Sequence, residues 1–477
     1  MKIQLFYVLT KSPNKMKKLI LIFCFSALVS VAQNVNIEFV NADYPFGSMP
    51  ANVQSSDLQD AYMQWKNSFV DTNCTNGRAR VKFDDPNFTV SEGIAYGMLL
   101  SAYANDQELF DGLWKYYQSH TNSNGVMNWK IEGCDTVNGQ NGATDAELDA
   151  AIALIIAGNR FGNTGSINYH QDAKDLIAIM KQHEIEGGSF VLKPGDAWGG
   201  SNNTNPSYFA PGYFRVYGEF TNDVAFWNNV TSKTYQILNA NLSVNNAVDC
   251  LVSDWCKADG TYSDIVPWAF NSGKSFYYDA ARTPWRIATD YLWYGKSEAA
   301  DYLNKCVSFV NRVGGLSNIK AGYNQDGTSI NNFQDPVYTG SFASSMLISN
   351  DQNVVDGVYT VTKNLTSTQY FATTLRVIYM FTLSGNFYNP VSSVLSADEI
   401  DYASKNHFVY PNPSSNQLFL KNFEVGTKLK VYTLNGKEVM KITVNNDSKS
   451  FVDISKLAVG TYFIRGKDVK LRFIKNN

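Results

Sequence analysis

The sequence contains few of the residues that bind metal ions or build disulfide frameworks. Its 477 residues include 4 histidines and 6 cysteines, and none of these lie at metal-ligand spacing. We therefore expect no required metal and no cofactor. The formal net charge of −3 provides no basic surface, so nucleic acid is not an expected partner. No repeat of about 30–40 residues is evident, which argues against a regular solenoid.

Long hydrophobic runs are missing except near the N-terminus. There Met16 and two lysines precede an apolar run from Leu19 to Val29, followed by the small residues Ser30-Val-Ala. This pattern is typical of a secretory signal peptide, which we expect to cover residues 1–32 with a true start at Met16. No other stretch is long enough for a transmembrane helix. We expect a protein that passes through the periplasm and is secreted or displayed on the cell surface.

The cysteines do not suggest a disulfide scaffold. Removal of Cys24 with the signal peptide leaves an odd, scattered set. Cys250 and Cys256 are close enough in sequence for one local bridge, and unpaired buried cysteines are the equally weighted alternative.

Aromatic residues are abundant, at 14% of the chain, within a hydrophobic content of 44% that is ordinary for a globular protein. Most such rings belong to a core. Tryptophan and tyrosine also form flat platforms with a polar tip, on which sugar rings stack well.

The chain divides into a long helical part and a short strand-rich part. Several helices occur as pairs joined by short polar turns, and 146–157 is apolar nearly all round, which together indicate two concentric layers of helices. Long Asn/Gly/Pro-rich connections at 121–145, 185–206, 258–279 and 314–340 are expected to be functional. The expected helices are 56–70, 91–105, 107–120, 146–160, 168–183, 206–219, 223–240, 283–295, 297–313, 340–349 and 370–384.

After Asn389-Pro390 a polar linker, 391–406, precedes a small β-sandwich at 407–477. Asn435-Gly436 predicts a type I′ hairpin turn between two of its strands. An accessory binding module is the alternative for this domain. The expected strands begin at Leu418, Leu429, Val439, Phe451, Thr461 and Leu471.

Three acids each follow a loop and begin a helix, and each has a purely structural interpretation. Glu92 lies three residues after Thr89, as in a capping box. Asp145 suits the positive end of a helix dipole, and Asp279 has Arg282 three residues later as a possible surface ion pair. Taken together, the three acids are expected to gather at one end of a helical barrel. Such a cluster suits glycosidic cleavage, in which one carboxylic acid protonates the leaving oxygen and another carboxylate acts on water or carbon.

Residues 43–390 resemble glycoside hydrolase family 8, and in particular its bacterial endo-β-1,4-glucanases. The matching stretches run in order through the helical part. They are Tyr44-Pro-Phe-Gly, Thr89-Val-Ser-Glu-Gly-Ile-Ala-Tyr-Gly-Met-Leu-Leu, Leu109-Phe-Asp-Gly-Leu-Trp-Lys-Tyr, Ala143-Thr-Asp-Ala, Val191-Leu-Lys-Pro-Gly-Asp-Ala-Trp-Gly-Gly, Asn205-Pro-Ser-Tyr-Phe-Ala-Pro, Ser253-Asp-Trp-Cys, Tyr278-Asp-Ala-Ala-Arg and Ser384-Gly-Asn-Phe-Tyr-Asn-Pro. The resemblance implies an (α/α)6 barrel and an inverting mechanism.

The resemblance also implies a role for each site residue. Glu92 is the general acid, Asp279 the general base, and Asp145 the acid beneath the central sugar. Tyr278 and Arg282 are expected to hold Asp279 and its water. For an inverting pair, the carboxyl groups of Glu92 and Asp279 should lie roughly 6.5–9.5 Å apart. Five further residues are expected to stack on sugars or line the cleft: Trp129, Trp198, Tyr208, Trp285 and Tyr370.

The resemblance favours β-1,4-linked glucan as the substrate, because the stretch Thr144-Asp-Ala-Glu-Leu-Asp has the cellulase-like form. Glu147 and Thr283 depart from the usual residues, which puts the outer subsites in question. Xylan or chitosan are alternative substrates, and a non-catalytic glycan-binding surface protein is the alternative class. We expect a monomer.

The tail from Phe408 resembles the C-terminal sorting domain of proteins exported by the type IX secretion system. The residues that carry this resemblance are Tyr410-Pro-Asn-Pro-Ser, Val431-Tyr-Thr-Leu-Asn-Gly-Lys, Leu457-Ala-Val-Gly-Thr-Tyr and Lys470-Leu-Arg-Phe-Ile-Lys. The secretion machinery is therefore an expected partner.

Overall fold

The computed structural model describes residues 37, 39–391, 408–410, 414–421, 423, 425–433, 437–444, 451–466 and 470–476. The expected signal peptide, nearly all of the expected linker and the Asn435-Gly436 turn lie outside these residues. The chain divides into two compact units, with the boundary in the sequence between Pro390 and Val391.

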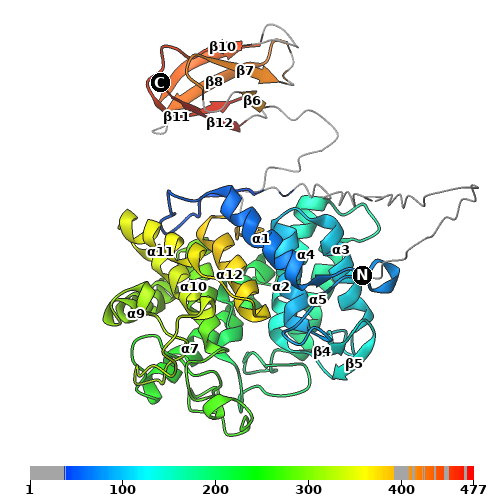
Figure 1. Ribbon diagram of the computed structural model, residues 1–477. Helices are drawn as coiled ribbons and strands as arrows, with labels where there is room; N and C mark the ends of the chain where they lie inside the picture. Colours follow the sequence, from blue (N-terminus) through cyan, green and yellow to red (C-terminus); the bar gives the residue numbers. More distant parts are fainter. Residues whose placement is uncertain are drawn as a thin grey trace, which may run out of the picture. The chain divides into compact units, whose positions relative to one another are not determined.

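The first unit is built from helices, twelve of them α-helices in the part of the chain that is described (Figure 1). They are α1 (Ser55–Phe69), α2 (Ser91–Tyr103), α3 (Gln107–Ser119), α4 (Thr144–Phe161), α5 (Tyr169–His183), α6 (Pro211–Thr221), α7 (Val224–Val244), α8 (Thr283–Tyr294), α9 (Ser297–Arg312), α10 (Pro336–Ser345), α11 (Gln352–Asn364) and α12 (Tyr370–Leu383).

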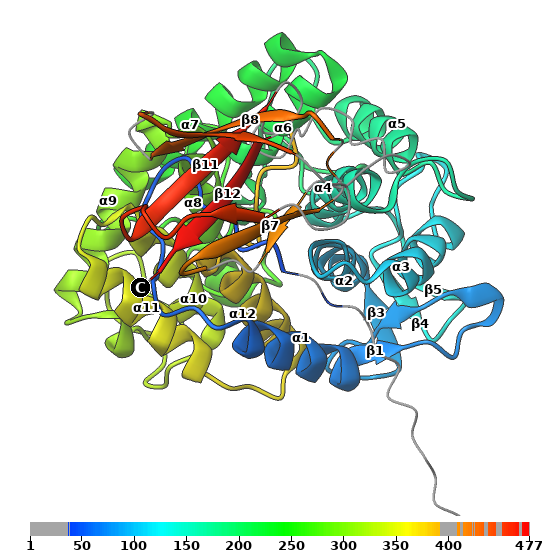
Figure 2. The same cartoon turned by 90° about the horizontal axis from the view of Figure 1, so that it is seen from above.

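The helices form two concentric layers, as the sequence predicted. The even-numbered helices are inner: α2, α4, α10 and α12 are buried along almost their whole length. The odd-numbered helices are amphipathic and bury a single stripe, as α1 does with Leu58, Tyr62 and Trp65. In Figure 2, α3 and α5 lie outside α2 and α4.

The inner helices close into a ring. Successive members pack against each other from α6 through α8 and α10 to α12, and α2 contacts both α12 and α4. Between α4 and α6, the Tyr217 hydroxyl donates to the Leu148 carbonyl at 2.5 Å, and Tyr213 donates to Asp149 at 3.0 Å. This arrangement confirms the expected (α/α)6 barrel.

Two helical predictions needed correction. Helix α11 was not predicted, because its valines and threonines are weak helix formers. Its buried residues Val355, Val358, Tyr359 and Thr362 nevertheless follow helical spacing. The expected helix 206–219 is interrupted: Pro206–Tyr208 form a 3-10 turn, and α6 begins afresh at Pro211, where the missing amide proton of proline is not needed.

Short strands in the loops support the start of α2. They are β1 (Val70–Asp71), β2 (Arg80–Val81), β3 (Phe88–Val90), β4 (Lys130–Glu132) and β5 (Thr136–Gly139). β1 pairs with β2, and β3-β4-β5 form an antiparallel sheet. The Ser91 amide, at the first residue of α2, donates to the Trp129 carbonyl at 2.9 Å. The first turn of α2 is thereby fixed to the loop that carries Trp129.

A disulfide joins Cys74 to Cys134, 60 residues apart, and this bridge was not predicted. It ties the loop after α1 to the turn between β4 and β5. Cys250 and Cys256 are free and buried, so the suggested local bridge between them is wrong and the alternative of unpaired buried thiols holds.

The second unit consists of two antiparallel sheets, in the orders β10-β7-β6 and β12-β11-β8-β9. Its apolar core includes Leu418, Val431, Ile464 and Phe473. This is the expected β-sandwich, with β6 added to the predicted strands. Its strands are β6 (Phe408–Tyr410), β7 (Gln417–Lys421), β8 (Lys428–Thr433), β9 (Glu438–Thr443), β10 (Phe451–Asp453), β11 (Gly460–Arg465) and β12 (Lys470–Lys475). Across the described parts of both units, no helix is long and apolar enough to cross a membrane.

Candidate active site

Glu92 lies in the first turn of α2, and both of its carboxyl oxygens accept hydrogen bonds from distant parts of the chain. The Tyr370 hydroxyl donates to Oε1 at 3.0 Å, and Nη1 of Arg282 donates to Oε2 at 2.8 Å. Thr89 belongs to β3, and the N-cap of α2 is Val90 without a side-chain cap. The capping-box interpretation is therefore wrong. A Cβ at Gly93 would lie 3.0 Å from the Tyr370 hydroxyl, so glycine at this position allows Tyr370 to approach α2 closely.

Arg282 joins the three candidate acids. Its guanidinium is buried, and Nη1 donates to Glu92 and, at 2.8 Å, to Oδ2 of Asp145. Nη2 donates to Oδ1 of Asp279 at 3.1 Å and to the Ser207 hydroxyl at 2.9 Å. The interpretation of Asp279 and Arg282 as a plain surface ion pair is wrong. Loops and helix starts that are up to 190 residues apart in sequence bring these side chains together.

The three acids differ in exposure to solvent. The side chains of Asp145, Glu92 and Asp279 are 3%, 17% and 33% exposed, respectively. Asp145 thus lies at the bottom of the cluster and Asp279 at its open edge. Glu92 and Asp279 bind different nitrogens of one guanidinium. The distance between their bound oxygens is therefore at most the lengths of the two hydrogen bonds plus the distance between those two nitrogens.

Burial sets the protonation of the inner acids. It raises the pKa of Glu92 to about 8; Arg282 opposes this shift, and the negative charge of Asp145 adds to it. Burial also raises the pKa of Asp145, again against the effect of Arg282. The pKa of Tyr370 is raised well above its usual range by burial and then by Glu92, so Tyr370 remains a phenol that donates to Glu92.

Two residues without a predicted role hold Asp279. The Trp255 indole Nε1 donates to Oδ2 of Asp279 at 3.0 Å. The buried Asp254 accepts the backbone amides of Tyr277 at 2.9 Å and Ala280 at 2.8 Å, which fixes the chain on either side of Asp279. Both belong to the Ser253-Asp-Trp-Cys stretch, whose match to a family pattern was the only signal in the sequence. The Tyr278 hydroxyl, which was expected to hold Asp279, donates instead to Asp335 at 3.1 Å.

The predicted aromatic cleft residues fall into two groups. Trp129 is 43% exposed and Trp198 is partly exposed, as a stacking platform requires. Trp285 is fully buried, and its Nε1 donates to Thr382 at 3.0 Å, so its assignment to the cleft is wrong. It lies in the first turn of an inner helix, whose side chains face the barrel core. Tyr370 is also fully buried and acts on Glu92 rather than as a stacking surface.

Tyr208 is almost entirely buried, with the guanidinium of Arg282 5.4 Å from its ring centroid. It therefore packs against the arginine that joins the acids.

Comparison with known proteins places this architecture in a family. The profile of glycosyl hydrolases family 8 matches residues 38–384. The chain belongs to glycosyl hydrolase family 8. A second profile, the secretion system C-terminal sorting domain, matches residues 408–476.

Curated relatives and solved structures agree with this assignment. Endoglucanase 2 of Ruminiclostridium josui is 38% identical over 398 residues, which cover 79% of this chain and 84% of the relative. Endoglucanase A of Acetivibrio thermocellus is 38% identical over 369 residues, covering 74% and 75% of the two chains. The structure of a beta-1,3-1,4-glucanase from Paenibacillus sp. X4 aligns with a TM-score of 0.69 at 31% identity, covering 74% of this chain and 99% of that one. The protein is thus a glycoside hydrolase.

Behind the family 8 acid cluster lies a second pair of carboxyl groups. Glu147 is fully buried on α4, two residues after Asp145, and its Oε1 accepts the Tyr117 hydroxyl at 2.6 Å and the Met127 amide at 3.2 Å. The Glu184 carboxyl is equally buried, and the negative charge of Glu147 acts on it. Burial raises the pKa of Glu147 to about 8 and that of Glu184 well above its usual range. Glu147 therefore supports α4 from within and does not line an outer subsite.

Thr283, the other departure from the family pattern, is likewise fully buried, at the start of α8. This departure from the family pattern therefore lies in the barrel wall rather than on the cleft surface.

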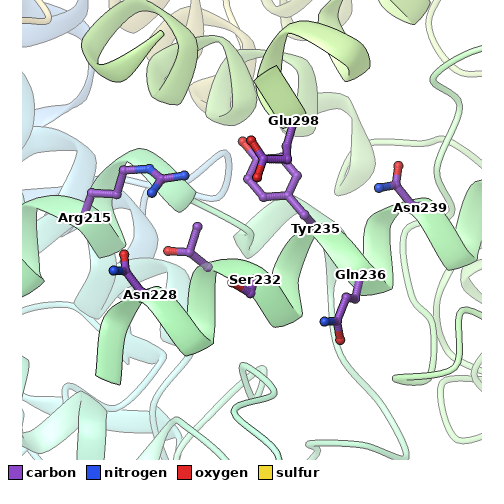
Figure 3. A pocket seen from close by; sticks show the side chains of 8 residues that line it. Arg215, Asn228, Ser232, Tyr235, Gln236, Asn239 and Glu298 are labelled. Atoms are coloured by element: carbon purple, nitrogen blue, oxygen red, sulfur yellow. The ribbon is translucent and has the colours of Figure 1, made fainter. Parts of the chain in front are cut away.

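A separate polar cavity of about 480 Å³ lies between α6, α7 and α9 (Figure 3). Its lining includes Arg215, Asn228, Gln236 and Glu298, and none of the three acids. It is therefore distinct from the candidate active site. Within the described residues, no group of three or more His, Cys, Asp or Glu side chains is arranged to hold a metal ion.

Proposed function

We propose that the protein is a secreted endo-glycosidase that hydrolyses β-1,4-linked glucan, of the cellulose or mixed-linkage type, with inversion at the anomeric carbon. Glu92 is the general acid and Asp279 the general base. The observation that carries this proposal is the convergence of three carboxylates of unequal exposure on the single buried guanidinium of Arg282.

Glu92 suits the role of the acid. With a pKa of about 8, it carries a proton at neutral pH that it can transfer to the glycosidic oxygen. As the proton leaves, negative charge develops on a carboxyl whose two oxygens already accept hydrogen bonds from Tyr370 and Arg282. These donors need no rearrangement to stabilise the carboxylate that forms.

Asp279 suits the role of the base. Trp255 and Arg282 each use one lone pair, on different oxygens, and so fix the orientation of the carboxylate. The remaining lone pairs are available on a side chain that is open to solvent at the edge of the cluster. A water held there can lose its proton to Asp279 while it attacks the anomeric carbon.

Asp145 lies deepest, where burial raises its pKa and the adjacent Arg282 cation opposes that rise by favouring the charged form. Placed beneath the sugar at the reacting centre, a negative carboxylate stabilises the positive charge that develops on the ring in the transition state.

Support for glucan comes from the relatives at 38% identity, which are endoglucanases, and from the structural neighbour at 31% identity, which is a beta-1,3-1,4-glucanase. Xylan or chitosan remain the alternative substrates, and a glycan-binding protein without catalysis is the alternative class. We assign residues 1–32 to the signal peptide, 33–390 to catalysis, 391–406 to a linker and 407–477 to sorting, with export by the type IX machinery and a monomeric enzyme.

The test is a panel of carboxymethylcellulose, barley β-glucan, xylan and chitosan, with chromatography of the products. We expect a ladder of soluble oligosaccharides from the two glucans. Glu92→Gln and Asp279→Asn should each lower turnover by roughly 10²–10⁴-fold with the fold intact, because an amide neither donates nor accepts the proton. Cleavage of xylan or chitosan alone would contradict the glucan assignment. A variant that kept more than about a tenth of wild-type turnover would remove its residue from the mechanism.

A further inference from the structure

One loop beside the base exposes aromatic side chains that the mechanism does not use. Between Ser263 and Gly273 the chain presents Trp268 with 66% of its surface exposed, Phe270 with 46%, and Ile265 with 47%. Large apolar side chains gathered on the surface of a soluble protein commonly mark a site of interaction.

The loop is held firmly against the active site. The Trp268 ring packs nearly perpendicular to that of Trp255, with centroids 5.4 Å apart, and contacts Trp198 at 6.5 Å. Phe270 stacks on Tyr277 with centroids 4.2 Å apart and planes inclined by 25°. Trp255 in turn donates to the base Asp279. Trp268 therefore directly contacts the residue that binds the base, and Phe270 directly contacts Tyr277, which precedes the base by two residues.

The backbone of the loop is shaped for this contact. The amide of Trp255 donates to the Gly273 carbonyl at 3.0 Å. Gly273 has a φ of +71°, and a Cβ there would lie 2.8 Å from Cδ1 of the Trp255 ring. Only glycine permits the loop to lie this close to Trp255. The loop that carries the exposed rings is thus held against Trp255, the tryptophan that orients Asp279, and Trp268 packs on it directly.

We propose that Trp268 and Phe270 form an additional stacking site for a β-linked glucan chain, beyond the sugars at the reacting centre. The inference rests on the proposed function, because it takes the occupant to be the chain being cut. The apolar faces of glucose rings in such a chain match flat, exposed aromatic surfaces, and Trp198 and Trp255 make the site continuous with the cleft.

The experiment compares wild type and Trp268→Ala, both as full chains, on cello-oligosaccharides from cellotriose to cellohexaose and on barley β-glucan. We expect KM to rise by about tenfold for the polymer and the longest oligosaccharides. The kcat values, the pH profile and the kinetics on cellotriose should not change. Phe270→Ala should show a smaller effect of the same kind, and Trp268→Phe should restore most of the affinity. Phe451→Ala, which removes an exposed ring from β10 of the second unit, is the matched control and should match wild type throughout.

Direct binding separates affinity from catalysis. Calorimetric titration of cellohexaose into Asp279→Asn and into the Asp279→Asn/Trp268→Ala double variant should show about tenfold weaker binding in the second. Equal binding, or an unchanged KM at every chain length, would overturn the stacking site while leaving the proposed function intact. A fall in kcat on cellotriose would also overturn it, since Trp268 would then act through Trp255 on the base. A wild-type enzyme inactive on every β-glucan would instead refute the proposed function.

Discussion

Replacement of Arg282 by methionine tests how the acid cluster is held together. Methionine has a similar length and no charge, so the substitution leaves Glu92, Asp145 and Asp279 without the cation that they share. Breaking a buried ion pair by removing one partner typically costs about 3–5 kcal/mol. We expect a loss of at least this size in the free energy of unfolding near pH 8, because three carboxylates lose their partner at once.

The loss should depend on pH. Arg282 lowers the pKa of both Glu92 and Asp145, so its removal raises these folded-state pKa values further above the unfolded ones. A group whose pKa is raised on folding stabilises the fold fully only below its unfolded pKa, and this contribution is lost as the pH rises through the folded pKa. The deficit of Arg282→Met should therefore be smallest near pH 5 and largest above pH 8.

The assay is denaturant unfolding of wild type and variant from pH 5 to pH 9, together with turnover on β-glucan. Arg286→Met is the matched control, since Arg286 is equally buried on α8 but binds the single carboxylate of Asp149, at 2.6 Å through each nitrogen. The control should lose stability but keep at least about a tenth of wild-type turnover, whereas Arg282→Met should lose nearly all of it. An Arg282→Met protein as stable as wild type at pH 8, or one that still turned over substrate at the control's rate, would refute the reasoning.

Three other properties follow from the structure. Turnover should fall as the pH rises through about 8, because Glu92 then loses the proton that it donates; a pH–rate profile with no alkaline limb below pH 9 would contradict this. Wild-type stability should decline between pH 4.5 and about 8, because Glu147 and Glu184 ionise in the unfolded chain while burial keeps them protonated in the fold, each contributing up to roughly 1.4 kcal/mol per pH unit. Glu184→Gln should flatten this decline in thermal unfolding; equal slopes would exclude the pair as its source. Cys74→Ala/Cys134→Ala should lower the unfolding free energy by about 2–5 kcal/mol, measured against a Cys250→Ala control under oxidising conditions. Addition of a reductant should destabilise only the wild type and the control, which both contain the bridge. Equal stability of the oxidised and reduced wild type would show that the bridge does not stabilise the fold.

Hydrophobic periodicity predicted the two layers of helices well, because inner and outer helices bury their surfaces in different ways, whereas the (α/α)6 barrel was implied by the family resemblance. The apolar stretch of α4 and the amphipathic stripe of α3 each follow from this difference. Helix α11 was not predicted, because its residue types favour strands, although its buried positions keep helical spacing. Contacts between segments that are far apart in the sequence leave no periodic pattern from which they could be predicted. The bridge between Cys74 and Cys134 spans 60 residues, and nothing in its spacing distinguishes it from the closer pair Cys250 and Cys256.

The candidate site was predicted only in part, because its side chains come from segments that lie far apart in the sequence. Family motifs pointed to Glu92, Asp145 and Asp279, and the structure brings all three to Arg282. The local rules misled where tertiary contacts override them. The spacing of Thr89 and Glu92 matches a capping box, yet Glu92 binds Tyr370 and Arg282 instead.

The aromatic residues show the same limit of sequence reasoning. Trp285 and Trp268 are the same type of residue, so the sequence does not distinguish them. The fold buries Trp285 and exposes Trp268.

The anomeric form of the first product tests the central claim most directly. If Glu92 donates a proton and Asp279 activates water, the water attacks from the face opposite the leaving group and the configuration inverts. Proton NMR, recorded within the first minutes of hydrolysis of a β-linked cello-oligosaccharide, should then show the α-anomer ahead of mutarotation. Appearance of the β-anomer first would contradict the account, because it would make Asp279 a nucleophile in a retaining mechanism.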